Sequence, residues 1–417
     1  MSKLINLKTF KEFFQSSSTG GIILIICVIA SLIIANTGAG NGFESLLAKE
    51  IGGHIGNVRL RYPILLWIND ALMAIFFLLV GLEIKREMVE GELSSFKKAS
   101  LPIIAALGGV LAPAAIYFAF NQGTETAGGW GIPMATDIAF AIAIISMLGK
   151  KVPSSLKIFL SALAIVDDLM AILVIAIFYS NDIHYTYLMY AVGIFIFLLL
   201  LNKLGVKNLS AYLIPGIFIW YFVHHSGVHA TIAGVLTAFA IPTTPDSIES
   251  PLEKLEHILV NPVNFVIMPI FALANTNIRL EAGMVSGLTT VLGLGIIAGL
   301  VLGKPFGITL FSWLAVKTRV GKMPKHASWM HIAGVGMLGG IGFTMSIFIA
   351  LLSFSGKQLI LSEAKFAILT ASIISGILGY LWLSRTENNH KKLKISKIET
   401  NISLKNLPGD QNWEAIE

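Results

Sequence analysis

The sequence contains little charge and almost no cysteine. Charged residues make up only 13% of its 417 positions, whereas 55% are hydrophobic. A soluble domain of this length needs far more charge to cover its surface, so the composition excludes an ordinary soluble protein and indicates one that faces lipid. The only cysteine, Cys27, lies in the first apolar run, which excludes a disulfide framework and a thiolate metal site.

A concentrated basic surface is also missing. The net charge is +6, but the lysines and arginines are scattered over short polar segments and form no basic domain. The charge therefore gives no support for a nucleic-acid partner, and a membrane protein accounts for it better. The first apolar run, residues 20–35, follows a polar stretch and precedes many similar runs, so we expect a retained anchor and not a cleaved signal peptide.

Long apolar runs are abundant. The hydrocarbon core of a bilayer needs about 20 apolar residues per helical span, or somewhat fewer in a short or broken one. The sequence therefore predicts an all-α polytopic membrane protein of about twelve transmembrane helices, with residues 1–384 as a single membrane domain. We expect spans at 20–36, 64–83, 100–120, 130–148, 155–179, 185–202, 207–223, 226–241, 258–276, 286–316, 328–353 and 363–384.

The distribution of basic residues predicts the orientation of these spans. With twelve spans and a cytoplasmic N-terminus, most of the 30 lysines and arginines fall in cytoplasmic segments. Fusing the seventh and eighth spans would place the basic loop 317–325 and the basic C-terminal segment outside, against the positive-inside rule. Both termini are therefore predicted to be cytoplasmic. Five basic residues are expected outside: Lys49, Arg59, Arg61, Arg279 and Lys357.

Two polar segments have distinct patterns. Residues 51–62 alternate apolar and basic positions after a glycine-rich bend, which predicts a small extracytoplasmic hairpin. Residues 385–417 are polar and lack periodicity, which predicts a disordered cytoplasmic tail.

A few ionisable residues lie well inside the predicted spans. Asp137, Asp167, Asp168 and Lys304 fall in the fourth, fifth and tenth of them, where a charge costs about 2.5–3.5 kcal/mol on insertion scales. One interpretation is a structural ion pair. It is weakened because three acids face one base, so that a second cation or protons must balance the remaining charge. Carboxylates in such a place can exchange protons and also coordinate a hard cation through oxygen.

Asp167 and Asp168 are neighbours in sequence, so they point about 100° apart around a helix. They cannot both face one cavity in the same way. We expect one of them to face the ion path and the other to face a neighbour such as Lys304.

Two predicted spans are interrupted. The fourth contains GGWGIPMATDIAF (128–140), where Pro133 removes a helical hydrogen bond just before Thr136 and Asp137. The eleventh contains GVGMLGGIGFTMS (334–346), whose glycines alone also fit close helix packing. Each is the middle member of a three-span group, 3–5 and 10–12, and the groups run in opposite directions. Paired interruptions of this kind indicate inverted-topology repeats with a site at the membrane midplane.

Several long motifs in this order resemble the NhaA-type sodium/proton antiporters, over residues from about 10 to 385. The resemblance rests on WINDALMAIFFLLVGLEIKREMVEGEL (67–93), ATDIAFAI (135–142), ALAIVDDLMAILVIAIFY (162–179), GVHATIAGVL (227–236), LEHILVNPVNFVIMPIFALAN (255–275), GLVLGKPFGI (299–308) and GGIGFTMSIFIA (339–350).

The resemblance implies a bacterial inner-membrane exchanger that extrudes Na⁺ or Li⁺ while protons enter, with no cofactor beyond the transported ions. It implies two crossed, broken helices at spans four and eleven. By motif match Asp167 and Asp168 form the ion-binding pair, with Asp168 the direct ligand, and Asp137 and Thr136 lie at the helix break. Lys304 is the nearby base, and the resemblance leaves open whether it carries a proton or serves as a structural partner.

The resemblance also implies regulation and assembly. The family's cytoplasmic pH-response cluster maps onto Glu83, Arg86, Glu87, Glu256 and His257. The 51–62 hairpin resembles the family's dimer contact, which implies a homodimer. Two positions depart from the pattern, because Val260 stands where some members have a second histidine and Glu253 replaces a basic residue. The pH profile is therefore the least transferable property.

Three histidines lie near the outer ends of spans seven and eight: His224, His225 and His229. We interpret them as polar residues at the membrane interface, and His229 is the best candidate for a functional role because it lies in the GVHAT motif. His257 lies in an acidic stretch and fits either a pH sensor or an ordinary loop histidine.

Two rival functions remain. An intramembrane aspartyl protease needs two carboxylates from different helices, which Asp137 with Asp167 or Asp168 would supply, but no GxGD sequence precedes any of them. A passive cation channel also suits broken helices, although it does not require Asp168 to titrate. We expect an antiporter and not an enzyme.

Overall fold

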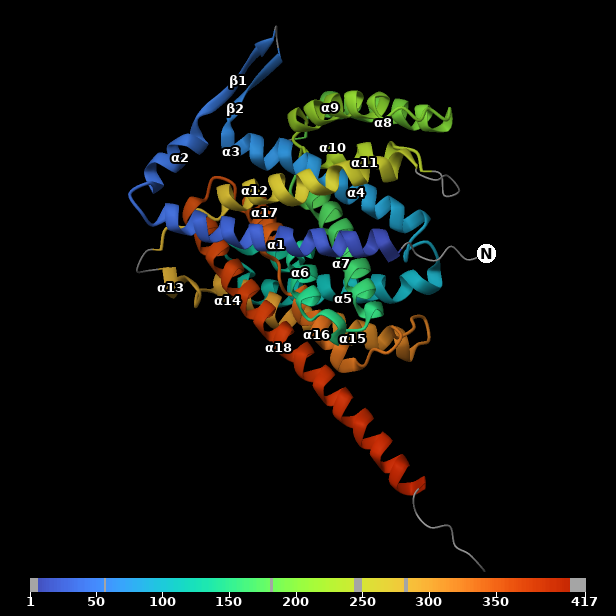
Figure 1. The fold of residues 1–417 in the computed structure, drawn as a ribbon. Coiled ribbons are helices and arrows are strands. Elements are labelled where there is room, and N and C mark those ends of the chain that lie inside the picture. The colour runs from blue at the N-terminus through green and yellow to red at the C-terminus, as the bar shows by residue number, and fades with distance from the viewer. Residues whose placement is uncertain (1–6, 56–57, 181–182, 244–249, 281–283, 406–417) are drawn as a thin grey trace, which may run out of the picture.

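The computed structural model describes residues 7–55, 58–180, 183–243, 250–280 and 284–405 (Figure 1). Within these ranges eight helices are long and apolar enough to cross a membrane, or ten if two bent helix pairs are each one span. An all-α polytopic membrane protein is therefore confirmed. The eight are Ile64–Val89, Phe96–Asn121, Ala127–Met147, Ser154–Phe178, Tyr185–Lys203, Pro251–Asn275, Val291–Lys317 and Gln358–Thr386.

Several of these spans consist of shorter helical elements that follow one another along the chain. The first half of the chain forms α1 (Leu7–Ala35), α2 (Gly40–Ala48), β1 (Glu50–Ile55), β2 (Val58–Pro63), α3 (Ile64–Leu66), η1 (Trp67–Leu72), α4 (Met73–Val89), α5 (Phe96–Asn121), η2 (Ala127–Met134), α6 (Ile138–Met147), η3 (Gly149–Lys151), α7 (Ser154–Phe178) and α8 (Tyr185–Lys203). The second half forms α9 (Ser210–His225), α10 (Ile232–Ala240), α11 (Pro251–Pro262), η4 (Val263–Ile267), α12 (Met268–Asn275), α13 (Met284–Gly287), α14 (Val291–Ala298), η5 (Gly299–Gly303), α15 (Lys304–Lys317), α16 (Trp329–Gly339), α17 (Phe343–Ser353) and α18 (Gln358–Lys405).

Segments of π-helix interrupt three of the spans. They are η1 before α4, η4 between α11 and α12, and η5 just before Lys304 at the start of α15. A π-helical turn holds more residues than an α-helical one, so it rotates the residues that follow it, and such turns are frequent at functional sites. Here η5 immediately precedes the one lysine that the sequence singles out inside a span.

The seventh and eighth predicted spans form two separate helices. α9 has 16 residues and α10 has 9, and neither is long enough by itself to count as a span. α9 packs on α8 and α10, and α10 packs on α4. By length, the described helices therefore support eight to ten spans, and the count of twelve stays a prediction.

α5 and α15 pack closely through glycine. A Cβ atom added to Gly307 would meet the carbonyl oxygen of Gly108, and one added to Gly108 would meet Gly307 and the Phe311 ring. The two backbones therefore touch, as in small-residue packing between membrane helices. This close approach fixes the rotation of α15 and so the direction in which Lys304 points.

We expect Gly307→Ala to lower the stability of the protein by about 1–3 kcal/mol, because the added methyl group forces the two backbones apart. Thermal unfolding in detergent measures the change. Gly193→Ala in α8 is the matched control, since nothing lies within 4 Å of a Cβ at that position. Equal melting temperatures for the two variants would contradict the packing argument.

The predicted hairpin over 51–62 is present. β1 and β2 pair antiparallel, with Glu50 opposite Pro63, Ile51 opposite Tyr62 and Gly52 opposite Arg61. Figure 1 shows the two strands projecting beyond the helices. Gly52 has a positive φ of 115°, a conformation that glycine adopts without strain.

The last helix does not end where the sequence places the start of a disordered tail. The backbone of α18 continues to Lys405, and Figure 1 shows it extending away from the helical body. Residues 385–405 are therefore helical in this structure, whereas 406–417 lie outside the described residues. Extending an existing helix avoids the cost of nucleating a new one, which is why a polar segment with weak periodicity can continue it.

Candidate functional site

The first interruption is at residues 135–137. The 3₁₀ segment η2 ends at Met134, the next three residues are not helical, and α6 begins at Ile138. Asp137 is the N-cap of α6, and its Oδ1 accepts a hydrogen bond from the Phe140 N–H at 3.2 Å. The predicted interruption of span four is therefore present, and Pro133 lies inside η2, two residues before the break begins.

The second interruption separates α16 from α17. α16 ends at Gly339, α17 begins at Phe343, and the two are bent by 47°. A Cβ at Gly340 would meet the carbonyl oxygen of Leu300, so glycine lets the broken backbone pass close to η5. The predicted interruption of span eleven is therefore present.

Each interruption satisfies the polar groups of the other. The Asp137 N–H donates to the Ile341 carbonyl at 2.6 Å. The Asp137 carboxylate accepts from the Thr344 N–H at 3.1 Å and from the Thr344 hydroxyl. Ser346 closes the contact, donating to the Ile132 carbonyl at 2.7 Å. Freed backbone groups at membrane depth are tolerated only where protein supplies partners, and these two breaks supply them mutually.

A buried ion pair lies beside the breaks. Lys304 Nζ is 2.8 Å from Asp167 Oδ2, and both side chains are fully buried. The lysine also donates to the Met134 carbonyl at the end of η2. The structure thus pairs Lys304 with Asp167, which the sequence left undecided.

Thr136 links the ion pair to the second break. Its Oγ1 lies 2.6 Å from Asp167 Oδ2 and 2.9 Å from the Gly339 carbonyl. A hydroxyl has one proton to donate, so it cannot fully satisfy both acceptors. The Thr136 hydroxyl is therefore shared between the Asp167 carboxylate and the carbonyl at the end of α16, and it ties the ion pair to the second break.

Asp168 is buried in the same region, with 2% of the residue exposed. It lies within electrostatic range of Asp167, Asp137, Lys304 and Glu83. Among the described residues, Oδ1 of Asp167 and Oδ1 of Asp168 have no hydrogen-bond partner. Buried polar atoms are rarely left so, and carboxylate oxygens are the ligands that hard cations prefer.

The described residues contain no group of three or more His, Cys, Asp or Glu side chains that could hold a resident metal ion. All five residues predicted at the exchange site, Thr136, Asp137, Asp167, Asp168 and Lys304, are brought into one buried region. Sequence reasoning assigned no role to Thr344 or Ser346. Their position directly after a glycine-rich break was the signal that could have found them, because hydroxyls there can bond freed backbone groups.

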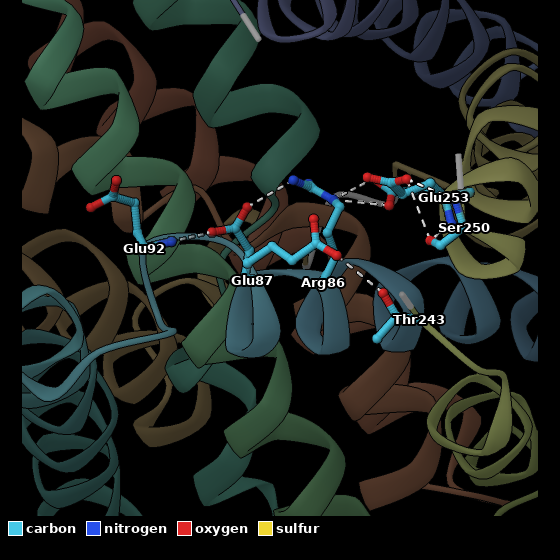
Figure 2. A network of polar contacts seen from close by, with 8 residues as sticks. Arg86, Glu87, Glu92, Thr243, Ser250 and Glu253 are labelled. Carbon is cyan, nitrogen blue, oxygen red and sulfur yellow. Dashed lines mark hydrogen bonds and ion pairs between the residues drawn. The ribbon is translucent and has the colours of Figure 1, made fainter. Parts of the chain in front are cut away.

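A second polar cluster surrounds Arg86 at the end of α4. Arg86 Nε donates to both carboxylate oxygens of Glu256, at 3.1 and 2.9 Å, and its Nη1 is 3.1 Å from Glu87 Oε1. Glu87 in turn accepts from the Glu92 N–H at 2.8 Å, as Figure 2 shows. The structure therefore brings together three of the residues mapped to a pH-response cluster.

Glu83 and His257 occupy different positions around this cluster. Glu83 is buried one turn before Arg86 and within electrostatic range of Arg86, Glu87 and Glu256. It also lies within electrostatic range of Asp168, so it stands between the cluster and the buried site. His257 is exposed. Glu253, which departs from the family pattern, caps α11 by accepting from the Ser250 N–H at 3.0 Å.

The three histidines at the end of α9 and in the segment after it make separate contacts. His224 Nδ1 is 2.8 Å from Asp70 Oδ2, His225 contacts the Tyr221 carbonyl, and His229 contacts the Thr231 hydroxyl at 3.2 Å. The pairing of His224 with Asp70 is tertiary and has no sequence signal.

The protein is an apolar helical body in which carboxylates and one lysine lie at two helix interruptions that contact each other. This arrangement is typical of secondary ion transporters whose binding site is formed by discontinuous helices. Residues 11–383 match the family described as Na⁺/H⁺ antiporter 1. The chain is 64% identical to a protein of Flavobacterium johnsoniae named Na(+)/H(+) antiporter NhaA 2, over 94% of this chain and 96% of that protein. It is 52% identical to the NhaA antiporter of Flavobacterium psychrophilum, over 91% and 97%, and 47% identical to that of Escherichia coli O1:K1, over 90% and 98%.

The chain belongs to the Na⁺/H⁺ antiporter 1 family. The resemblance drawn from the motifs is confirmed.

Proposed function

We propose that this chain is a secondary antiporter that extrudes Na⁺ or Li⁺ while protons enter. The observation that carries the proposal is the buried group of Asp167, Asp168 and Lys304 beside two interlocked helix breaks. The relatives are named Na(+)/H(+) antiporters, which supports the same exchange here.

The mechanism is competition between ions for the same carboxylates. When the site faces outward, Asp167 and Asp168 take up protons and release Na⁺. When it faces the cytoplasm, where the pH is higher, they lose protons and their oxygens bind Na⁺. The Oδ1 atoms without hydrogen-bond partners among the described residues are suited to a transient hard cation.

Charge balance favours an electrogenic cycle. Two buried carboxylates face one lysine, so the site can hold more than one proton for each Na⁺ that it releases. Exchange of two protons for one Na⁺ moves net charge, and the membrane potential then drives the cycle together with the pH gradient.

The finer topology is twelve spans with inverted repeats at spans 3–5 and 10–12. The matching breaks in the middle of each group support it. α9 and α10 then form two short spans, and both termini are cytoplasmic in a bacterial inner membrane. In Figure 1, α1 begins and α18 ends toward the right, whereas α2 and the hairpin lie toward the left. Residues 1–384 form the transporter domain, and 385–417 the cytoplasmic segment.

Two rivals fit the geometry less well. A protease needs two carboxylates that share a proton and a water molecule, but the described contacts of Asp137 go to Thr344 and Phe140, and those of Asp167 go to Lys304 and Thr136. A passive channel would conduct Na⁺ without moving protons in the opposite direction.

In everted vesicles that contain the protein and hold a pH gradient, added Na⁺ should collapse the gradient. Na⁺ flux without proton movement would overturn the antiporter.

The cluster of Glu83, Arg86, Glu87, Glu256 and His257 adjusts this exchange to cytoplasmic pH. The position of Glu83 between Arg86 and Asp168 supports an electrostatic route from the cluster to the site. A change of charge around Arg86 then alters the field at Asp168 without contact with the transported ion.

We expect Glu256→Gln to move the midpoint of the pH–activity curve to lower pH by about one unit, equivalent to about 1.4 kcal/mol of changed charge interaction. The change removes a negative charge and frees Arg86 to stabilise the remaining carboxylates. Na⁺-dependent exchange measured across a pH series tests this. Glu253→Gln on the same helix is the control, since glutamine can also serve at this cap position. An unmoved curve in Glu256→Gln would remove the cluster from regulation.

The 51–62 hairpin is the proposed contact between two copies. It projects from the helices, and its two strands form the whole of the sheet among the described residues, so each has one edge open to another strand. Glu50 and Arg61 form an ion pair across the two strands of one copy, with Arg61 Nε 3.0 Å from Glu50 Oε2. This pair helps to hold the strands together while their outer edges stay open, and a two-fold arrangement can join the same edge of both copies.

A further inference from the structure

A polar contact between a carboxylate and a histidine joins two distant parts of the chain near the base of the hairpin. Asp70 lies in η1, at the start of the second span, and His224 lies in the last turn of α9. Their Oδ2 and Nδ1 atoms are 2.8 Å apart, and the two side chains are only 14% and 18% exposed. The described mechanism of exchange uses neither residue.

Aromatic rings enclose this pair. The His224 ring is stacked on Trp220, with centroids 5.7 Å apart, and meets the edge of Tyr62 at 5.1 Å. Trp67 stacks on Trp220 at 5.9 Å and meets Tyr62 at 6.0 Å. The four rings therefore form a closed circuit of contacts, each in a stacked or edge-to-face geometry that aromatic pairs favour.

The circuit holds both strands of the hairpin. Tyr62 belongs to β2, opposite Ile51 of β1. Trp67 Nε1 donates to the Ile51 carbonyl at 3.2 Å, so a ring of the circuit also bonds β1 directly. A two-stranded hairpin is marginally stable alone, and its direction depends on what it packs against at its base.

We propose that Asp70, His224, Tyr62, Trp67 and Trp220 form a brace that fixes the direction of the hairpin and thereby sets how strongly two copies of the chain pair. The inference rests on the proposed dimer contact and adds the residues that position it. The brace joins the hairpin to η1 and α9, so loosening it lets the hairpin swing and raises the entropy lost on pairing.

The partner is a second copy of this chain. The open strand edges favour addition of another strand, and the same hairpin on a second copy supplies such an edge. Because Arg61 is already paired with Glu50 in its own copy, the backbone edges are the groups left to bind a partner, and a lipid headgroup would not add a strand to them.

The test measures dimer dissociation in lipid vesicles. The single native cysteine allows a Cys27→Ala background in which Lys357→Cys, at an exposed position, carries one fluorophore. Stepwise photobleaching at decreasing protein-to-lipid ratios then gives the dissociation constant. The variants are deletion of residues 51–62, His224→Leu, Trp67→Phe and, as matched control, Trp382→Phe. Trp382 lies in α18, and its Nε1 donates to the Met330 carbonyl at 2.8 Å, so the control removes an equivalent indole bond outside the brace.

We expect the deletion to abolish pairing, His224→Leu and Trp67→Phe each to weaken it about tenfold, and Trp382→Phe to leave it unchanged. Na⁺-dependent exchange, measured on the same samples, should persist in His224→Leu and Trp67→Phe and serves as the check on folding. If the deletion leaves dimers intact, the proposed dimer contact is wrong. If the deletion abolishes dimers but His224→Leu and Trp67→Phe pair normally, the brace is wrong. Equal weakening by Trp382→Phe also overturns it. Should His224→Leu fail to fold, Trp67→Phe alone tests the brace, because phenylalanine keeps an aromatic ring at this position and removes the hydrogen bond to the Ile51 carbonyl.

Discussion

Asp168→Asn is expected to abolish the Na⁺-dependent collapse of a pH gradient in everted vesicles, with a loss of at least about a hundredfold in exchange rate. Asparagine keeps the size and one oxygen ligand of the side chain but cannot release or accept a proton near neutral pH. Asp168 lies buried beside Asp167 and within electrostatic range of Lys304, so its charge is part of the balance of the buried group. A loss of a hundredfold corresponds to about 2.7 kcal/mol in the barrier.

Asp70→Asn is the matched control for this change. It also removes a carboxylate from a membrane helix, but that carboxylate contacts His224 near the base of the hairpin and lies outside the buried group. Exchange should persist in Asp70→Asn. Normal exchange in Asp168→Asn would mean that protons and Na⁺ do not compete at this carboxylate. Na⁺ entry with no proton movement in the unmodified protein would instead favour the channel.

Local chemistry made much of the site predictable. Pro133 removes a backbone N–H, and the glycines of residues 334–346 lower helix propensity, so both breaks could be proposed without the fold. Proline alone does not locate a break, because Pro102 and Pro113 lie inside the continuous helix α5. The cost of charge in lipid likewise singled out Asp137, Asp167, Asp168 and Lys304 before any contact was known. In each case the signal belongs to one residue or to its immediate neighbours.

Contacts between distant helices were not predictable in the same way. Whether Lys304 bonds Asp167 or Asp168 depends on the rotation of α15 against α7, and that rotation is set by the contact of Gly307 with Gly108 and by the π-helical turn before Lys304. No sequence pattern encodes either. The pair of Asp70 and His224 joins residues 154 positions apart and was missed for the same reason.

Helix ends were also poorly determined by hydropathy. The predicted last span stops at residue 384, where apolar residues end, yet α18 continues to Lys405. Hydropathy marks where a helix leaves lipid and not where its backbone unwinds, since added helical residues need no new nucleus. The short helices α9 and α10 show the opposite case, in which a predicted span is built from fewer helical residues than usual.

Lys304→Met is expected to lower the stability of the protein by about 3–5 kcal/mol, because it leaves the Asp167 carboxylate buried without its cationic partner. Adding Asp167→Asn should recover most of this loss, since the double variant buries no uncompensated charge at that position and asparagine can still bond Thr136. The coupling between the two changes, measured by thermal unfolding of the four proteins in detergent at one pH, isolates the ion pair from the other contacts of each residue.

Lys365→Met is the control, since it removes a lysine from α18 that forms no ion pair among those of the described residues. If the double variant is as unstable as Lys304→Met, the lysine stabilises the protein through its bond to the Met134 carbonyl at the helix break, and the pairing with Asp167 contributes little.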